Sequence, residues 1–233
     1  MNVLLNLVFP PRCPVCDAIR PITREGTCLP CKDSFQVISS PFCYRCGKPL
    51  AMTEGEYCSD CTRISHRFKS GRALYRYDSC AASLYRLKYG NRPEYARTLG
   101  NEMAKRFASF LQESGANALI PVPLHAARRN VRGYNQSDLL ARAISRHCGI
   151  PMRSDIVVRV KNTLPMKDLT PTERQNNLKK AFHIKQNEVK LETTIIIDDI
   201  YTTGATIDAI SKVLLEHGVK NIFFLTLACG VEM

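Results

Sequence analysis

Eight of the eleven cysteines form four Cys-x-x-Cys pairs near the start of the chain, and they constrain the fold more than any other feature. The pairs begin at positions 13, 28, 43 and 58, a constant spacing of 15 residues. Zinc binds four thiolates tetrahedrally, and each Cys-x-x-Cys turn presents two sulfurs on one side of the backbone. We therefore predict two structural zinc sites, formed by Cys13, Cys16, Cys28, Cys31, Cys43, Cys46, Cys58 and Cys61.

The spacing repeats as a unit of about thirty residues, which favours pairing of neighbouring motifs over interleaved pairing without proving it. A segment with so little apolar content cannot bury a core, so the metal should supply its folding energy. All eight thiolates are used, which predicts structural and not catalytic sites. Disulfides are the main alternative and are disfavoured by a cytosolic setting, and an iron–sulfur cluster is a second alternative. Gly47, directly after Cys46, suits the turn of a zinc knuckle.

A stretch near the C-terminus, residues 193–206, joins an apolar strand to a polar loop and a helix. Its β-branched run is typical of a strand buried on both faces, and it ends at Asp198 and Asp199. A helix is expected over 204–216, and the N–H groups at a helix N-terminus converge on a point that favours an anion. We predict a phosphate-binding loop formed by Thr202, Thr203, Gly204, Ala205 and Thr206.

The two acids narrow the choice of ligand, because carboxylates beside a phosphate loop repel phosphate unless they face another group. Vicinal ribose hydroxyls, or a Mg²⁺ ion carried by the ligand, fit that role. The stretch contains neither the Gly-Lys-Ser/Thr of a Walker loop nor a Gly-x-Gly-x-x-Gly turn. We therefore predict binding of a ribose 5-phosphate such as 5-phosphoribosyl 1-pyrophosphate (PRPP) with Mg²⁺. The alternative is an ordinary buried strand with a threonine-rich cap.

Positive charge is concentrated in the middle of the chain. Residues 62–180 carry 23 basic and eight acidic side chains, a net of +15, in a chain whose formal net charge is +12. Residues 128–137 place three arginines near a glycine, a tyrosine and two amides, which suits a mobile loop that closes on pyrophosphate. A solvated basic loop is the alternative. The expected pyrophosphate residues are Lys88, Arg128, Arg129, Arg132, Gly133, Tyr134, Asn135 and Gln136.

Tyrosines are interleaved with the basic residues of this middle segment. They are Tyr75, Tyr77, Tyr85, Tyr89 and Tyr134. Aromatic side chains beside a cationic track bind single strands without sequence preference, which predicts a single-stranded DNA partner. Several of the spacings also suit core packing, so a packed core with a solvated basic surface is the alternative.

Strand and helix patterns alternate after the cysteine array. Strands are expected at 71–77, 118–122, 156–160, 193–198 and 221–228, and helices at 81–89, 95–111, 137–147, 171–178 and 204–216. This pattern predicts an α/β fold with a parallel sheet, flanking helices and ligands at the carboxyl ends of the strands. A hood that recognises a base would have to come from the zinc ribbons or from residues 161–185.

No signal peptide or membrane insertion is predicted. The apolar stretch Val3–Phe9 is short, has no basic leader and runs into two prolines, and no apolar run approaches the length of a membrane span. We expect a cytoplasmic protein. Three cysteines outside the pairs, Cys80, Cys148 and Cys229, are expected to be small buried side chains.

Residues 193–206 resemble the PRPP loop of type I phosphoribosyltransferases, in which two acids bind the ribose hydroxyls and Thr-Gly-x-Thr binds the 5′-phosphate. Together with the cysteine pairs, further motifs occur in the order seen in the ComF family of competence proteins, which includes GntX-type members. These motifs are Pro121–His125, Arg132–Gln136, Glu173 and Arg174 with Asn176, and Phe182. The chain departs from the family at Met166, where a glutamine is often found.

The resemblance covers essentially the whole chain. It implies a double zinc ribbon at residues 1–65 joined to a type I phosphoribosyltransferase-like domain at residues 66–233. It also implies a role in natural transformation on incoming DNA, with single-stranded DNA and competence helicase or recombination proteins as partners. Two alternatives stay open: an active phosphoribosyltransferase with an unidentified acceptor, and a zinc-ribbon adaptor for other proteins.

Overall fold

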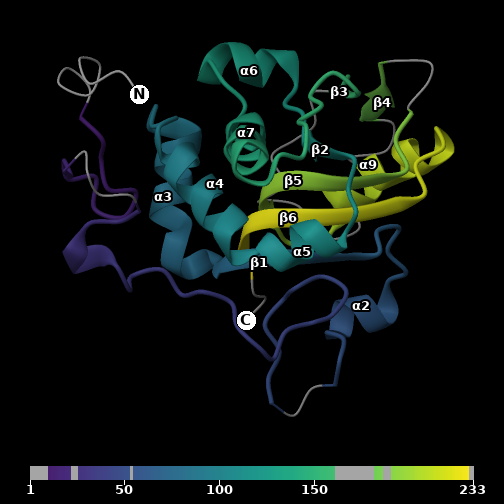
Figure 1. Ribbon diagram of the computed structural model, residues 1–233, viewed down its shortest axis with the longest axis horizontal. Coiled ribbons are helices and arrows are strands. Elements are labelled where there is room, and N and C mark those ends of the chain that lie inside the picture. Colours follow the sequence, from purple (N-terminus) through teal and green to yellow (C-terminus); the bar gives the residue numbers. More distant parts are fainter. Residues whose placement is uncertain (1–9, 22–25, 53–54, 161–180, 186–189, 231–233) are drawn as a thin grey trace.

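The computed structural model describes residues 10–21, 26–52, 55–160, 181–185 and 190–230 (Figure 1). Its helices are η1 Leu29–Cys31, α2 Ser59–Arg63, α3 Tyr77–Tyr89, α4 Tyr95–Arg106, α5 Ala108–Glu113, α6 Ala126–Arg132, α7 Gln136–Cys148 and α9 Ala205–Glu216. Its strands are β1 Ser70–Arg76, β2 Ala118–Pro121, β3 Val157–Arg159, β4 Phe182–Ile184, β5 Thr193–Tyr201 and β6 Asn221–Cys229. The elements after residue 66 confirm the expected α/β class.

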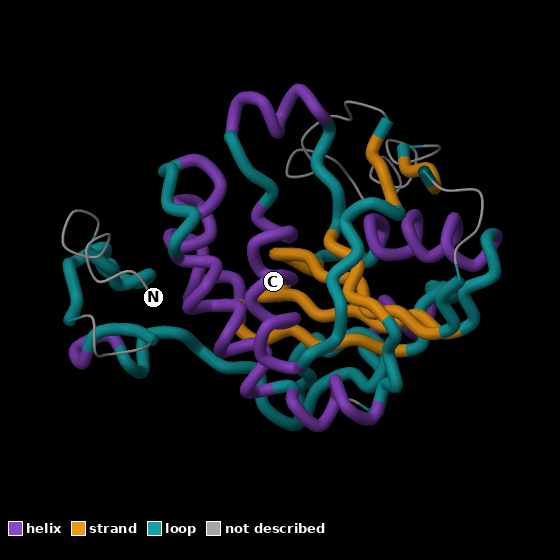
Figure 2. Tube along the Cα trace, turned by 45° about the horizontal axis from the view of Figure 1, so that its top comes forward, coloured by secondary structure: helices purple, strands orange, loops and turns teal. Residues whose placement is uncertain are grey.

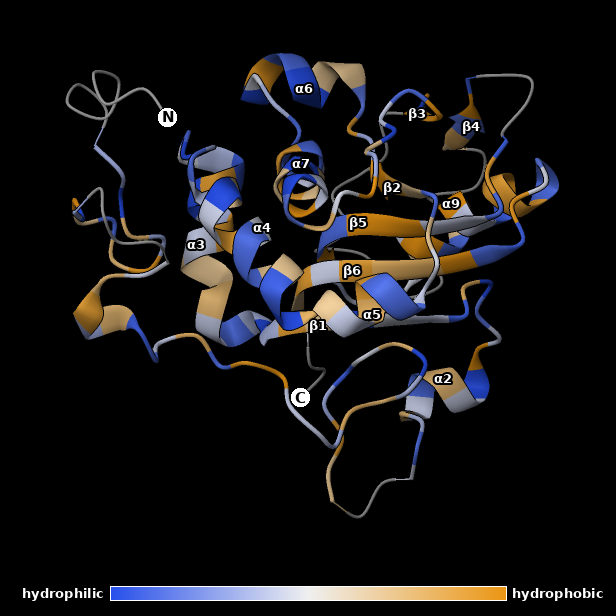
Figure 3. Ribbon diagram, viewed as in Figure 1, coloured by the Kyte–Doolittle hydropathy of each residue, from blue (hydrophilic) through white to orange (hydrophobic). Residues whose placement is uncertain are grey.

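The centre of the molecule is a four-stranded sheet in the order β1-β6-β5-β2, and its three strand pairs are all parallel. Strands buried on both faces need long apolar runs, and β5 supplies one in Ile195, Ile196 and Ile197, each fully buried. Figure 2 shows the strands running between helices. Figure 3 shows that β5 and β6 are largely apolar, whereas α6 carries more polar residues.

Alternation along β5 divides the interior into two cores. Ile195 and Ile197 belong to a core with α3, α4 and α7, whereas Ile196 belongs to a core with α9 and the β3–β4 pair. Successive side chains of a strand point to opposite faces, which explains the division. The strand continues through Asp198 and Asp199 to Tyr201, three residues beyond the expected end, so the acids lie within the strand and not in a turn.

The strand expected at 156–160 is present as β3, but it does not join the parallel sheet, and that part of the prediction was wrong. β3 pairs antiparallel with β4, with Val157 opposite Ile184 and Arg159 opposite Phe182. The chain meets the edge of β2 only at the isolated bridge between Met152 and Leu119, and then leaves it. β3 is half-exposed along most of its length, unlike the mostly buried strands of the main sheet.

Two helical expectations also needed correction. The segment expected to be a loop around Arg128 is the helix α6, which begins where the His125 ring accepts a hydrogen bond from Ala127 N at 3.3 Å. It ends at Gly133, whose φ of +81° makes it a left-handed C-cap. The helical pattern over 95–111 is split into α4 and α5 at Phe107. The helix expected at 171–178 lies outside the described residues.

The cysteine array forms two similar units, and we call residues 10–33 the first ribbon and residues 40–63 the second ribbon. Their backbone hydrogen bonds repeat after thirty positions: Cys13 N donates to Ala18 O at 2.9 Å, and Cys43 N donates to Lys48 O at 2.8 Å. The bridge Arg12–Ile19 likewise corresponds to Phe42–Pro49. The predicted thirty-residue repeat is therefore present in the backbone as well as in the cysteine spacing.

The second ribbon and the segment before it pack on the edge of the main sheet. Ile38 N donates to Leu74 O and Arg76 N donates to Gln36 O, each at 2.9 Å, so residues 36–38 cover strand β1. An exposed strand edge invites pairing with other chains, and this cover removes that hazard. In Figure 1 the second ribbon lies below β1 and the first ribbon lies beside α3.

Candidate functional site

The four sulfurs of each predicted zinc site come together in the structure. Within each group of four, all sulfur atoms lie within 4.8 Å of one another. The first group is Cys13, Cys16, Cys28 and Cys31, and the second is Cys43, Cys46, Cys58 and Cys61. Pairing is therefore between neighbouring motifs, which settles the question that spacing left open. Zinc–thiolate bonds of about 2.3 Å in a tetrahedron separate sulfurs by about 3.8 Å. The Cys16–Cys28 and Cys46–Cys58 separations of 3.7 and 3.6 Å fit that geometry.

The two clusters differ in their surroundings. Cys43, Cys46 and Cys58 are buried, whereas Cys16 of the first cluster is exposed. A buried four-thiolate metal site carries a net charge of about −2 that needs nearby cations. Lys48 supplies one, because its buried side chain interacts with the Cys46 thiolate and bonds Asp60 at 2.6 Å.

The two acids of the predicted ribose site are both buried at the carboxyl end of β5, where they have different partners. Asp198 Oδ1 accepts hydrogen bonds from Ser137 Oγ at 3.0 Å and from the backbone N–H of Asp199 at 2.9 Å. The Asp199 carboxylate is ion-paired with Lys88 at the end of α3. The structure therefore brings one residue of the predicted pyrophosphate set directly onto the acids.

Burial controls the charge of this group. Burial first, and then the charge of Asp199, raise the pKa of Asp198 to about 8. Burial alone would lower the pKa of Lys88, but the ion pair with Asp199 and the nearby Asp198 raise it overall. Burial and the neighbouring carboxylate therefore both favour the protonated form of Asp198 in the free protein, whereas Asp199 is ion-paired with Lys88.

The predicted phosphate loop has the geometry that anion binding requires. Gly204 adopts φ +78° immediately before α9, and its carbonyl accepts the first helical hydrogen bond from Asp208 N at 2.8 Å. A Cβ at Gly204 would lie 2.7 Å from the Tyr201 hydroxyl and 3.0 Å from the His66 ring, so glycine is required there. Thr203 Oγ1 is buried and has no hydrogen-bond partner among the described residues, which leaves it available to a ligand.

The remaining residues of the predicted pyrophosphate set divide into two groups. Asn135 is buried and caps α7, its side chain accepting from Ser137 N at 3.2 Å and donating to Val122 O at 2.9 Å. Gln136 is buried and accepts from Arg132, and the Tyr134 hydroxyl donates to Leu87 O at 2.6 Å. These side chains hold the corner between α6 and α7 in place. The arginines of α6 stand next to this corner.

The tyrosines predicted to face DNA also divide. Tyr75 is buried and donates to Glu102, and Tyr134 is held as described, so neither offers a free ring. Tyr85 and Tyr89 on α3 are 65% and 68% exposed, and their ring centroids are 5.3 Å apart. The Arg132 guanidinium lies 5.2 Å from the Tyr89 ring. We call Tyr85, Tyr89 and Arg132 the tyrosine patch; it adjoins Lys88.

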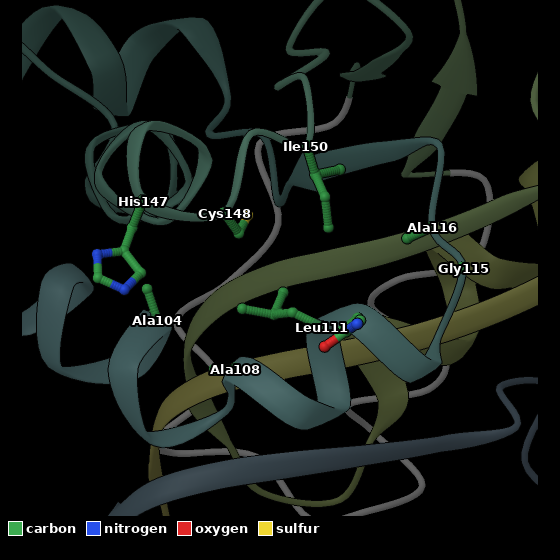
Figure 4. A pocket seen from close by; sticks show the side chains of 9 residues that line it. Ala104, Ala108, Leu111, Gly115, Ala116, His147, Cys148 and Ile150 are labelled. Carbon is green, nitrogen blue, oxygen red and sulfur yellow. The ribbon is translucent and has the colours of Figure 1, made fainter.

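A surface hollow of about 420 Å³ lies away from these residues (Figure 4). It is lined by residues of α4, α5 and the end of α7, together with Gly115 and Ala116 before β2. Ligands of parallel sheets bind at the carboxyl ends of strands, and this hollow is at the amino end of β2. Cys148 in its wall is half-buried, whereas Cys80 and Cys229 are buried as expected.

Three residues near the acids and the loop were not anticipated. Ser137 bonds Asp198, and His66 and Asp208 bond each other at 2.6 Å beneath the phosphate loop. Asp208 carried one signal, because acids are favoured in the first turn of a helix. His66 carried none. Met166, Arg174 and Asn176 lie outside the described residues, whereas Phe182 is buried, as expected of a packing residue.

Comparisons with known proteins cover most of the chain. A double zinc ribbon family model matches residues 4–62, and the model "PRTase ComF-like", where PRTase denotes phosphoribosyltransferase, matches residues 66–231. Competence protein F of Haemophilus influenzae is 34% identical over 91% of this chain and 93% of its own length. Competence protein ComFC of Bacillus subtilis is 29% identical, over 83% and 80%. The DNA utilization protein YhgH of Salmonella typhimurium is 27% identical, over 93% and 96%.

Among solved structures, a purine phosphoribosyltransferase from Pyrococcus horikoshii is 19% identical with a TM-score of 0.36, over 56% of this chain and 72% of that one. Fold and cysteine clusters define a double zinc ribbon joined to a phosphoribosyltransferase-like α/β domain. The chain belongs to the ComF family of competence proteins. No helix among the described residues is long and apolar enough to cross a membrane.

Proposed function

We propose that the protein binds PRPP with Mg²⁺ and single-stranded DNA, and that it acts on incoming DNA in the cytoplasm during natural transformation. The observation that carries the PRPP assignment is the junction of β5 and α9. There, two buried carboxylates are followed within five residues by a left-handed glycine, an unpartnered threonine hydroxyl and a helix N-terminus.

Each part of PRPP has a complementary group in this junction. Asp198 and Asp199 would bind the ribose hydroxyls or the Mg²⁺ that the ligand carries. The N–H groups and hydroxyls of residues 202–206 would bind the 5′-phosphate. Lys88 and the arginines of α6 would face the pyrophosphate, because cations placed there neutralise its charge. Lys88 would have to exchange part of its pairing with Asp199 for the ligand.

The two cysteine clusters would each hold one structural zinc. Their sulfur separations fit tetrahedral thiolate coordination, and each cluster uses all four ligand positions. Neither site would then offer an open position for a substrate. The chemistry of the protein is expected at the β5–α9 junction.

Calorimetric titration of Mg-PRPP into the zinc-loaded protein tests the PRPP assignment. Wild type should bind, and Asp198→Asn combined with Asp199→Asn should lose binding while the fold and two zinc ions per chain are retained. Asp155→Asn is the matched control, because Asp155 pairs with Arg153 in an exposed position. Binding by the double variant at wild-type affinity would refute the assignment.

For DNA we propose the tyrosine patch as the stacking surface. Base–aromatic stacking contributes about 1–3 kcal/mol per base, so Tyr85→Ala with Tyr89→Ala should weaken binding of oligo(dT) at least about tenfold. Tyr57→Ala is the control, because Tyr57 is also exposed but belongs to the second ribbon. Affinity should also fall steeply with salt. A flat salt response, or equal affinities of the two tyrosine variants, would contradict the proposal.

An active phosphoribosyltransferase is the second candidate, favoured by Lys88, which is ion-paired with Asp199 beside the proposed ribose site. In that reaction the C1–oxygen bond to pyrophosphate breaks, and a bond from C1 to an acceptor nitrogen forms. Pyrophosphate release, followed in the same titrations with and without DNA, distinguishes the two. DNA-dependent release would make the protein an enzyme acting on or near nucleic acid, whereas binding without release favours a PRPP-dependent DNA-handling protein. A zinc-ribbon adaptor role is expected if PRPP does not bind.

A further inference from the structure

The second ribbon is connected to the phosphate loop through the short segment that follows it. Cys58 caps α2, α2 ends at Arg63, and His66 follows three residues later. His66 Nδ1 donates to Asp208 Oδ2 at 2.6 Å, and Arg67 N donates to Asp208 Oδ1 at 2.7 Å. The Asp208 carboxylate, in the first turn of α9, therefore bonds two consecutive residues, His66 and Arg67, that lie more than 140 positions earlier in the chain.

His66 also forms part of the surface on which the loop rests. Its side chain is fully buried, and its ring stacks on Phe68 with centroids 4.7 Å apart. The ring and the Tyr201 hydroxyl are the nearest atoms to the Cβ position of Gly204. Nε2 has no hydrogen-bond partner among the described residues, so the ring is held through Nδ1 and through its stacking on Phe68. Removal of the ring would leave Gly204 and the Asp208 carboxylate without this support.

Tyr201 makes a second connection between the loop and the metal cluster. It stacks on Phe224 with centroids 4.8 Å apart, and it shares a core with Cys43, Cys46 and Cys58. Its hydroxyl lies 2.7 Å from the Cβ position of Gly204. The first ribbon has no comparable connection in the part of the chain that the structure describes. Among the described residues, its polar contacts with the α/β domain, such as Arg92 to Asp17, run to α3, α4 and the turn between them.

We propose that the second ribbon positions the phosphate loop. His66 and Asp208 are the positioning residues that connect its metal cluster to the loop. Metal in the Cys43–Cys61 cluster then fixes residues 66 and 67 against α9, and ribose-phosphate affinity depends on the second metal and not on the first. The proposal rests on the proposed binding of PRPP at this loop. It adds a role for the zinc ribbon beyond its own folding.

Variants of His66 test the connection without removing a metal. His66→Ala should weaken Mg-PRPP binding about tenfold, because a hydrogen bond to a charged carboxylate that orders the loop is lost. His66→Asn, which keeps a donor near the position of Nδ1, should recover part of the affinity. Asp17→Asn is the matched control, because it weakens the first ribbon's ion pair with Arg92 and should leave the affinity unchanged.

Hydrogen exchange of residues 203–208 without ligand supplies a readout that does not depend on PRPP binding. His66→Ala should speed exchange there while two zinc ions per chain remain bound, and Asp17→Asn should not. If wild type does not bind PRPP, the proposed function fails, while the exchange data still report on the connection. Wild-type exchange and affinity in His66→Ala would overturn the proposal.

Stepwise removal of zinc by a chelator tests the metal itself. The first cluster has the exposed Cys16 and should release its zinc first, which alkylation of the freed cysteines and mass spectrometry can verify. Release of the zinc ion of the first cluster should leave Mg-PRPP affinity unchanged, and release of the zinc ion of the second cluster should abolish binding. Loss of affinity with the first equivalent, or binding that persists after the second, would overturn the dependence on the second cluster.

Discussion

The two ribbons share one backbone plan but are attached to the α/β domain in different ways. The residue after the second cysteine of the leading pair is left-handed in both, Asp17 with φ +62° and Gly47 with φ +74°. At Gly47 a Cβ would lie 2.9 Å from both Arg72 Cα and Gly71 O, so the second ribbon approaches β1 at backbone distance. At Asp17 there is room for a side chain, which bonds Arg92 at 2.9 Å and Tyr95.

The difference shows that a repeated metal module can be either a peripheral attachment or part of a domain core. The second ribbon contributes Cys43, Cys46 and Cys58 to the core that contains α9 and Tyr201. The first ribbon is attached mainly by polar contacts, such as Ser83 Oγ donating to Pro14 O at 2.6 Å. Extensive buried apolar contact stabilises more than single hydrogen bonds, so the two ribbons should differ in how much of the molecule depends on them.

The largest expected effect compares one cysteine from each cluster. Cys46→Ser should lower the free energy of unfolding by more than about 5 kcal/mol, because it removes a ligand from a buried metal site within the core. Cys16→Ser should lose the first zinc and leave the main unfolding transition nearly unchanged. Thermal unfolding with zinc stoichiometry measures both. Equal losses of stability would show that the ribbons are equivalent after all.

A second test exchanges the left-handed residues. Gly47→Ala should destabilise by about 3 kcal/mol, because its Cβ meets backbone atoms and its φ disfavours any side chain. Asp17→Gly keeps the backbone conformation and loses the side-chain contacts to Arg12, Arg92 and Tyr95, at about 1 kcal/mol. Urea denaturation gives both values. A tolerated alanine at Gly47 would contradict the close approach to β1.

A third test uses pH, because the two acids of the site point toward different partners. The native state raises the pKa of Asp198 from its usual value near 4 to about 8, so the folded protein binds this proton more tightly than the unfolded chain. The stability that this group contributes is therefore present at low pH and is lost as the pH rises from the unfolded-state pKa to the folded-state pKa. The free energy of unfolding of Asp198→Asn, relative to that of wild type, should therefore rise by about 1–3 kcal/mol between pH 5.5 and pH 8.

The comparison variant for this pH test is Asp199→Asn. It leaves Lys88 without its ion-pair partner and should destabilise throughout the same range. Denaturant titrations at several pH values distinguish the two variants. A pH-independent difference between Asp198→Asn and wild type would show that Asp198 is ionised in the free protein.

The smallest expected effect concerns the attachment of the first ribbon. Arg86→Ala removes the hydrogen bond to Val15 O at 2.8 Å and should reduce stability by about 0.5–1 kcal/mol. Faster release of the first zinc, with unchanged release of the second, is the expected signature in a chelator assay. Unchanged release of the first zinc would mean that this contact does not hold the ribbon.

Local motifs made most of the site predictable. The two cysteines of each pair lie within a few residues of one another, and so do the buried run of β5, the two acids and the glycine before α9. Short-range geometry determines what such neighbouring residues can do together. Helix α6 was missed because Arg128 and its neighbours were judged by charge, whereas the capping by His125 and Gly133 decided the local structure. The extra strand residues after Asp198 were missed because pairing with β6 determines where β5 ends.

By itself the sequence determined two four-cysteine sites, an α/β domain and an acid-plus-phosphate loop, because each depends on neighbouring residues. Only the tertiary structure decided that the second ribbon enters the core, that β3 leaves the main sheet, and that Lys88 meets Asp199. It also brought His66 to Asp208 across more than 140 positions. Contacts of this kind depend on how whole elements pack, and neither partner carries a local pattern that identifies the other.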